Sequence, residues 1–177
     1  MGLGAEEAVV RVTPLVSMPK SEIAEAAKDV LERLLTLMEV AGSIVLQTQS
    51  IVEGEEAASI VLNIKGDDLG ILIGRRGQTL SCLQYIVRLI VGHQTKVWEP
   101  IVIDVEGYKQ RRYQALQAFA QNMAEQVEAK GAPFTLEPMT PYERRIVHLA
   151  LADHPDVTTE SIGEGEARRV VILPKEQ

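Results

Sequence analysis

The first regular pattern in this 177-residue chain is a run of apolar residues at helical spacing. From Ile23 to Val40 these side chains recur every three or four positions, which predicts an amphipathic helix. Ser21 stands where an N-cap is expected, and Gly42 stands where the helix should end. Residues 1–20 contain two prolines and are predicted to form a tail without regular structure.

Strand-like patterns follow this helix. Two β-rich runs, at 43–53 and 57–64, are separated by the glycine-containing segment 54–56, which predicts a hairpin. A further strand is expected at 96–105. Together with the first helix, these runs predict a small sheet with helices packed against it.

Two helical segments, 69–73 and 78–91, lie between the second and third predicted strands and are joined by a four-residue turn. An aspartate before the first of them, Asp67 or Asp68, is expected to cap it. Cys82 is the only cysteine, so no internal disulfide exists, and its place in an apolar run predicts a buried structural thiol. The second segment is expected to bury one face, formed by Leu80, Leu83, Ile86, Val87 and Ile90.

The pattern changes after Gly107. A long helix is predicted over 108–130, followed by a short strand at 133–137, a further helix, and a hairpin of strands at 157–162 and 167–173. The sequence therefore predicts an α+β fold with three parts. A tail covers residues 1–20, a unit of order α-β-β-α-α-β covers 21–105, and a unit of order α-β-α-β-β covers 106–177.

Composition and charge narrow the class of protein. The apolar content of 46% is too high for a disordered chain, and no apolar run approaches the ~20 residues of a membrane span. Without a signal-peptide pattern at the start, a cytoplasmic location with no membrane insertion is expected. The net charge of −7 disfavours a simple polyanion binder, yet residues 57–112 carry eight basic and five acidic residues. A local basic face is therefore predicted there.

That basic segment contains the turn Gly74-Arg75-Arg76-Gly77. Glycine at both ends lets the backbone turn sharply and leaves its N–H groups uncovered. Those N–H groups, the start of the following helix and two guanidinium groups all favour a phosphate. A corner between two helices also needs glycine for geometry alone. A Walker phosphate loop does not match, because Leu72 and Gln78 stand where glycine and lysine are required.

A second basic cluster lies on the helix after Thr140. Thr140 and Glu143 have the spacing of a capping box, and the helix should run to about Asp153. Arg144 and His148 are four residues apart, so they project from one face, and on an exposed face both can reach phosphate oxygens. The alternative is that His148 only packs or hydrogen-bonds within its own domain.

Other basic residues are less informative. Arg145 neighbours Arg144, whereas Arg168 and Arg169 alternate on a strand, so at most one of them joins a shared patch. The cluster formed by Lys109, Arg111 and Arg112 is typical of a solvated helix face.

These motifs resemble a known family. The order of the first unit and the segment Ile73–Leu80 resemble a type II KH domain, and Arg144-x-x-x-His148 within 136–151 resembles the R-three-H domain, a family of single-stranded nucleic-acid binders. A KH domain followed directly by an R-three-H domain is similar to the bacterial Jag family, also called SpoIIIJ-associated or KhpB proteins. Further similar segments are 66–70, 103–108 and 168–172.

The resemblance implies non-enzymatic binding of single-stranded RNA in the bacterial cytoplasm, without cofactor or metal, and links to post-transcriptional control of cell elongation, cell shape or the envelope. It also implies pairing with a small KhpA-like KH protein, or self-association. Many Jag proteins carry an additional N-terminal domain and a charged linker. This sequence has about twenty residues before its first predicted helix, so it is expected to be a short form to which functions of that domain do not extend.

In the leading hypothesis the turn grips the RNA backbone, beside an apolar groove for unstacked bases. That groove would be lined by Ile71, Ile73, Leu80 and one face of the strand 59–64. In the second unit, phosphate would be contacted by Arg144 and His148, with Arg145 or one of Arg168 and Arg169. Few aromatic residues occur, so base stacking should be limited and the affinity of each site modest.

Three alternatives stay open. The ligand is single-stranded DNA instead of RNA, or the acidic chain is a protein-interaction or dimerisation module. An enzyme is the weakest alternative, because the histidines show no metal-ligand spacing with Cys82, and no Ser-His-Asp or paired-carboxylate arrangement is recognisable.

Overall fold

A computed structural model describes residues 18–47 and 60–175 of the chain. The elements of the first unit are α1 (Lys20–Leu37), β1 (Ser43–Gln47), β2 (Ile60–Lys65), α2 (Gly70–Ile73), the short 3-10 helix η1 (Arg75–Gly77), α3 (Gln78–Thr95) and β3 (Ile101–Val105). Those of the second are α4 (Tyr108–Lys130), β4 (Phe134–Thr135), α5 (Pro141–Ala150), β5 (Val157–Ile162), η2 (Gly165–Ala167) and β6 (Arg169–Pro174). The predicted α+β class and element order are confirmed.

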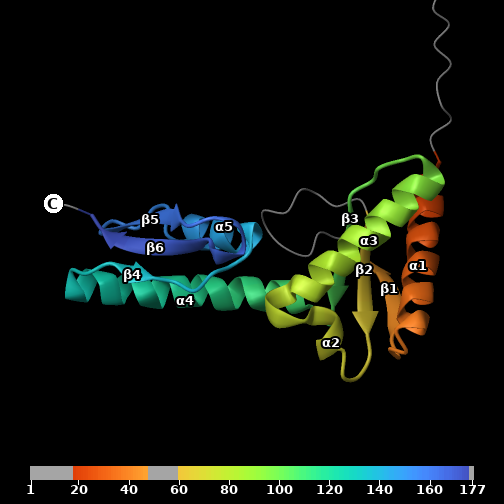
Figure 1. Cartoon of the computed structure of the whole chain (residues 1–177), viewed down its shortest axis with the longest axis horizontal. Helices are drawn as coiled ribbons and strands as arrows, with labels where there is room; N and C mark the ends of the chain where they lie inside the picture. Colours follow the sequence, from red (N-terminus) through yellow and green to blue (C-terminus); the bar gives the residue numbers. More distant parts are fainter. Residues whose placement is uncertain (1–17, 48–59, 176–177) are drawn as a thin grey trace, which may run out of the picture.

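The first unit is a three-stranded sheet of order β1-β2-β3 with α1 and α3 packed along it (Figure 1). β1 and β2 are antiparallel, whereas β2 and β3 are parallel, with Leu62 opposite Ile103. Because strand side chains alternate between faces, Leu62 and Ile103 point into the same core as the apolar stripes of both helices. The turn predicted at 54–56 lies outside the described residues.

The second unit is an antiparallel sheet of order β4-β6-β5, packed against α4 and α5. β5 and β6 form the predicted hairpin. Its core is a separate cluster of small and branched side chains, formed by Ala120, Ala124, Val127, Leu136, Val147, Leu151, Val157, Val170 and Ile172. α4 has the predicted bounds and ends at Gly131, which adopts the left-handed conformation that favours glycine there (φ 62°).

The predicted ends of the first helix are wrong. Pro19, not Ser21, is the N-cap, and its carbonyl accepts bonds from the first turn. α1 stops before Val40 because Glu39 turns to a positive φ of 57°. Gly42 has a different role, since a Cβ there would approach Ile64 to 3.1 Å. Asp67 and Asp68 do not cap α2 either, because its N-cap is Leu69 without a side-chain bond.

Two predictions about the face of α3 are also wrong. Cys82 is exposed, and Ile86 is 44% exposed. The buried stripe runs through Leu83, Val87 and Val91 at spacings of four residues. Cys82 and Ile86 each precede a member of this stripe, and one residue is about 100° around a helix, so both turn away from the core.

The junction between the units is held to the first sheet. The Glu106 amide donates to the Ile64 carbonyl (3.1 Å), and the Glu106 carboxylate accepts from the Gly66 amide (3.0 Å). The Lys109 amide donates to Asp104 Oδ1 (3.1 Å), while burial raises the pKa of the Asp104 carboxyl. The first turn of α4 therefore belongs structurally to the first unit, and the rest of α4 carries the second unit away from it (Figure 1).

In the described part of the chain, none of the helices combines the length and the apolar character that crossing a bilayer requires.

Candidate nucleic-acid interface

The two glycines of the turn are required by geometry. Gly74 and Gly77 adopt positive φ angles of 66° and 76°. A Cβ on Gly74 would lie 2.0 Å from Thr79 Oγ1, and one on Gly77 would lie 3.0 Å from the ring of Tyr108. The turn thus packs tightly on the starts of α3 and α4, and a side chain at either glycine would push it away from them.

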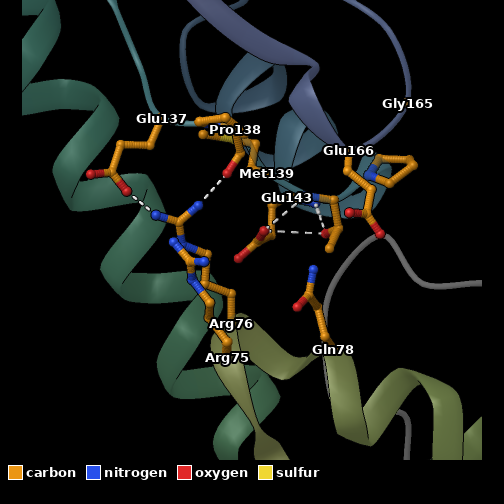
Figure 2. A pocket seen from close by; sticks show the side chains of 11 residues that line it. Arg75, Arg76, Gln78, Glu137, Pro138, Met139, Glu143, Gly165 and Glu166 are labelled. Carbon is orange, nitrogen blue, oxygen red and sulfur yellow. Dashed lines mark hydrogen bonds and ion pairs between the residues drawn. The ribbon is translucent and has the colours of Figure 1, made fainter.

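The two arginines of the turn have different surroundings. Arg75 is exposed, whereas the Arg76 side chain is 27% exposed and crosses to the second unit. There it donates to the backbone carbonyl of Pro138 and forms an ion pair with Glu137 (Figure 2). Arg76 itself adopts a left-handed backbone conformation (φ 55°). The two guanidinium groups that were predicted to bind phosphate are therefore not equivalent. That of Arg75 is exposed, whereas that of Arg76 is engaged in contacts within the chain.

The predicted apolar groove is not formed by its three side chains together. Ile71 is 70% exposed and offers apolar surface beside the turn. Ile73 is half-buried against the core, and Leu80 is only 2% exposed within it. Leu80 therefore supports the turn from below and presents almost no surface to a base. Ser59, part of the strand expected to line the groove, lies outside the described residues.

His148 is bonded through both ring nitrogens. Nδ1 lies 2.7 Å from Thr159 Oγ1, and Nε2 lies 2.8 Å from Ser161 Oγ. Thr159 and Ser161 are two apart on β5, so they share one face of the strand. The alternation of these two hydroxyl residues is visible in the sequence, but their contact with His148 depends on how β5 packs on α5. These bonds match the interpretation in which His148 hydrogen-bonds within its domain.

Arginines nevertheless gather around this histidine. Burial, then the nearby charges of Arg144 and Arg168, hold the pKa of His148 below its ordinary value. Arg144 is half-buried and donates to the Met139 carbonyl (3.0 Å). The prediction that Arg168 and Arg169 share a strand is wrong, because β6 begins at Arg169 and Arg168 follows η2. Arg168 is the one close enough to affect His148, whereas Arg169 donates to the Ala167 carbonyl (3.2 Å). Arg145 is exposed on α5.

The sequence predicted that the cluster at the start of α4 is a solvated helix face, but its three basic side chains are engaged in contacts within the chain. Arg112 Nη2 lies 2.7 Å from Glu143, whose side chain is 4% exposed, and Arg112 Nε donates to the same oxygen at 2.9 Å. Lys109 Nζ donates to Gln84 Oε1 (2.9 Å), and Arg111 donates to the Glu106 carbonyl. Glu143 also closes the predicted capping box with Thr140, which is confirmed.

A cleft separates the turn from the second unit. It has a volume of about 770 Å³, and Figure 2 shows Arg75, Arg76 and Gln78 on one side of it and the segment from Glu137 to Met139 on the other. Two smaller cavities, of about 430 and 320 Å³, adjoin it, and Arg76 borders all three. Sequence reasoning gave no signal for Glu137, because its role depends on how the two units meet.

The described residues contain no cluster of side chains that could bind a metal ion. Within residues 18–47 and 60–175, no group of three or more His, Cys, Asp or Glu side chains is placed to hold a metal ion.

Two family models match the chain. One is the KH domain of KhpA and KhpB, over residues 28–102, and the other is the R-three-H domain, over residues 114–174. The fold and the two basic clusters thus define a protein in which a KH domain precedes an R-three-H domain. Both families are named for domains of this kind and not for a catalytic activity, as expected from the sequence.

Relatives identify the family. The chain is 37% identical over all 177 residues to the RNA-binding protein KhpB of Clostridium symbiosum, of which it covers 75%. It is 33% identical over 123 residues to the protein of that name from Bacillus subtilis, covering 59% of it, and 35% identical over 111 residues to that of Lactiplantibacillus plantarum, covering 34%. The chain belongs to the KhpB family.

Proposed function

We propose that the chain binds single-stranded RNA without catalysing a reaction, through the turn of its KH domain and the arginine-flanked histidine of its R-three-H domain. The observation that carries this proposal is the turn itself. Two sterically required glycines present two consecutive arginines at the start of α3, within the one basic segment of an acidic chain. The relatives named above are called RNA-binding proteins, which supports the same ligand here.

In the KH domain the turn contacts the sugar-phosphate backbone of the RNA, and neighbouring groups contact the bases. Arg75 and the helix start attract a phosphate, and the exposed Ile71 provides an apolar surface for a base. Because Leu80 is buried, this surface is narrower than the sequence predicted. We therefore expect contact with few nucleotides and a modest affinity for this site alone.

In the R-three-H domain the positive charge comes from the arginines. The lowered pKa of His148 leaves its ring uncharged at neutral pH, so Arg144 and Arg168 supply the attraction for phosphate. His148, fixed by Thr159 and Ser161, then acts by orienting α5 against β5, beside the arginines that contact the phosphate. Arg145 extends the same basic surface on the exposed side of α5.

The wider role we propose is that of a post-transcriptional regulator in the bacterial cytoplasm, linked to cell elongation or envelope control. Sequencing of the transcripts crosslinked to the protein in cells tests it, and a set unaffected by loss of both turn arginines would reject it.

A small KhpA-like KH protein is the proposed partner, since one KH family model describes both KhpA and KhpB. The apolar side chains of Tyr85, Ile86 and Leu89 on the outer face of α3 offer it a surface. Sedimentation of the two proteins together measures whether they associate.

Fluorescence anisotropy with a pool of short single-stranded RNAs tests the proposed activity. We expect Arg75→Asp/Arg76→Asp to weaken binding about ten-fold or more and to reduce its salt dependence, because phosphate contacts release counterions. Arg88→Asp/Lys96→Asp is the matched control, since it changes the charge equally at two exposed positions of the same basic segment outside the turn. Equal losses of RNA affinity in the two variants would mean that the turn contributes only its positive charge and is not a specific phosphate site. Single-stranded DNA of the same sequences shows whether RNA is preferred.

A further inference from the structure

The cleft between the two domains places an acidic side chain where the proposed RNA ligand would place a phosphate. Arg76 is one of the two cations of the turn, and in the structure its guanidinium is paired with the Glu137 carboxylate (Figure 2). A carboxylate and a phosphate present similar oxygens to a guanidinium, so they compete for the same donors. While Arg76 holds Glu137, the turn offers RNA only part of its charge.

We infer that the cleft is a binding site for a nucleotide of the RNA strand, and that Glu137 sets its affinity by competing with the RNA phosphate for Arg76. This inference rests on the proposed RNA binding. It adds a site between the domains, next to the turn, and a residue of this chain that opposes binding there.

The cleft has the size and chemistry that such a ligand needs. Its volume of about 770 Å³ falls within the range of small-molecule sites, roughly 300–1,000 Å³. Arg75 and Gln78 line it from the KH side, the first as a cation and the second as an amide that both donates and accepts hydrogen bonds. Pro138 and Met139 line the opposite wall and add apolar surface.

The other carboxylates at the cleft are of two kinds. Glu143 is nearly fully buried and is neutralised by Arg112, so it does not repel a phosphate strongly. Glu166 also lines the cleft and is exposed, at the short helix η2. Glu137 differs from both because it sits on the arginine that the ligand needs.

The exposure of the Arg76–Glu137 ion pair indicates that an RNA phosphate replaces the Glu137 carboxylate easily. The side chain of Glu137 is 78% exposed and that of Arg76 is 27% exposed. An ion pair with one partner in water is weak, so an arriving phosphate displaces Glu137 at little cost. On release, Glu137 turns into solvent, while Arg76 keeps access to the Pro138 carbonyl and reaches the phosphate. Glu137 therefore tunes the affinity and does not block the site.

A double-mutant cycle tests this competition, with RNA affinity measured by anisotropy at low and near-physiological salt. We expect Glu137→Gln to tighten binding about two- to five-fold, the range that an exposed ion pair supports. Removing any acid from the chain raises affinity slightly, so Glu128→Gln, at an exposed position on α4, is the control of equal charge. In an Arg76→Gln background, Glu137→Gln should give no more than the control. Urea unfolding of each variant confirms that it is folded.

The outcomes separate this inference from the proposed function. If Glu137→Gln matches Glu128→Gln, or if its effect persists without Arg76, the competition is overturned, even where the turn variants lose binding as proposed. If the wild type binds no RNA at either salt concentration, both the inference and the proposed function fall. Tighter binding by Glu137→Gln that depends on Arg76 supports the site in the cleft.

Discussion

His148 shows how a residue that marks a sequence motif can have a structural role in the folded domain. The sequence left open whether it contacts phosphate or hydrogen-bonds within the domain, and the structure shows the hydrogen bonds, to Thr159 and Ser161. Burial of the ring and the charges of the nearby arginines lower the pKa of His148 and so favour the neutral ring. A residue that identifies the R-three-H motif in the sequence is thus, in the free protein, a fixed neutral contact between α5 and β5.

The lowered pKa of His148 predicts a pH-dependent stability. In the unfolded chain its pKa is about 6.5, above the folded value, so between the two values the unfolded state binds more protons. The stability that neutral His148 contributes is therefore complete above about pH 6.5 and is lost as the pH falls below that. Urea unfolding between about pH 5 and pH 8 measures it. The wild type should lose stability at acidic pH relative to His148→Gln, and parallel pH profiles would contradict this.

The buried carboxylate of Glu143 links α4 to α5. Glu143 accepts from the Thr140 amide at the start of α5 (3.0 Å) and also holds Arg112 of α4. One side chain thus satisfies an unpaired N–H group at the start of a helix and fixes that helix to its neighbour. The capping half of this arrangement was predictable from local spacing, whereas the Arg112 half joins residues 31 positions apart.

We expect Arg112→Ala to destabilise the protein by about 2 kcal/mol. The substitution leaves the Glu143 carboxylate buried without its charged partner, and losing hydrogen bonds to a charged group costs about 1.5–3 kcal/mol. Arg145→Ala is the control, because Arg145 is exposed and such positions usually change stability by less than about 0.5 kcal/mol. Chemical denaturation compares the two variants. Equal costs would mean that the Arg112–Glu143 pair is energetically neutral.

The molecule as a whole was predictable wherever local signals decided its structure. Gly131 marked the end of α4, and the Thr140–Glu143 spacing marked the start of α5. The misses depend on distant contacts, on helix phase, or on which of several neighbouring residues caps a helix, as at the starts of α1 and α2. Cys82 looked buried because its neighbours are apolar, yet it lies about 100° from the buried stripe. The Arg76–Glu137 pair joins residues 61 apart, and no periodicity in the sequence relates them.

The arrangement of the two proposed sites on one chain leads to a prediction about RNA length. A KH turn clamps about four nucleotides, so an oligonucleotide of that length should fill the first site alone. A longer strand that also reaches the Arg144 and Arg168 surface binds the second site at a high effective concentration, because the junction at Glu106 holds α4 to the KH sheet. Affinity should therefore rise about ten-fold or more beyond a threshold length, with a steeper salt dependence.

Anisotropy with oligonucleotides of increasing length measures this threshold, and Arg144→Ala/His148→Ala identifies its cause. If the R-three-H surface provides the gain, this variant should bind the shortest RNA as the wild type does and lose only the increase with length. A gain that survives in the folded variant would mean that the additional nucleotides bind elsewhere, with the cleft at Arg76 as the next site to test. A variant that weakens binding equally at every length would instead show that both motifs contact the same few nucleotides.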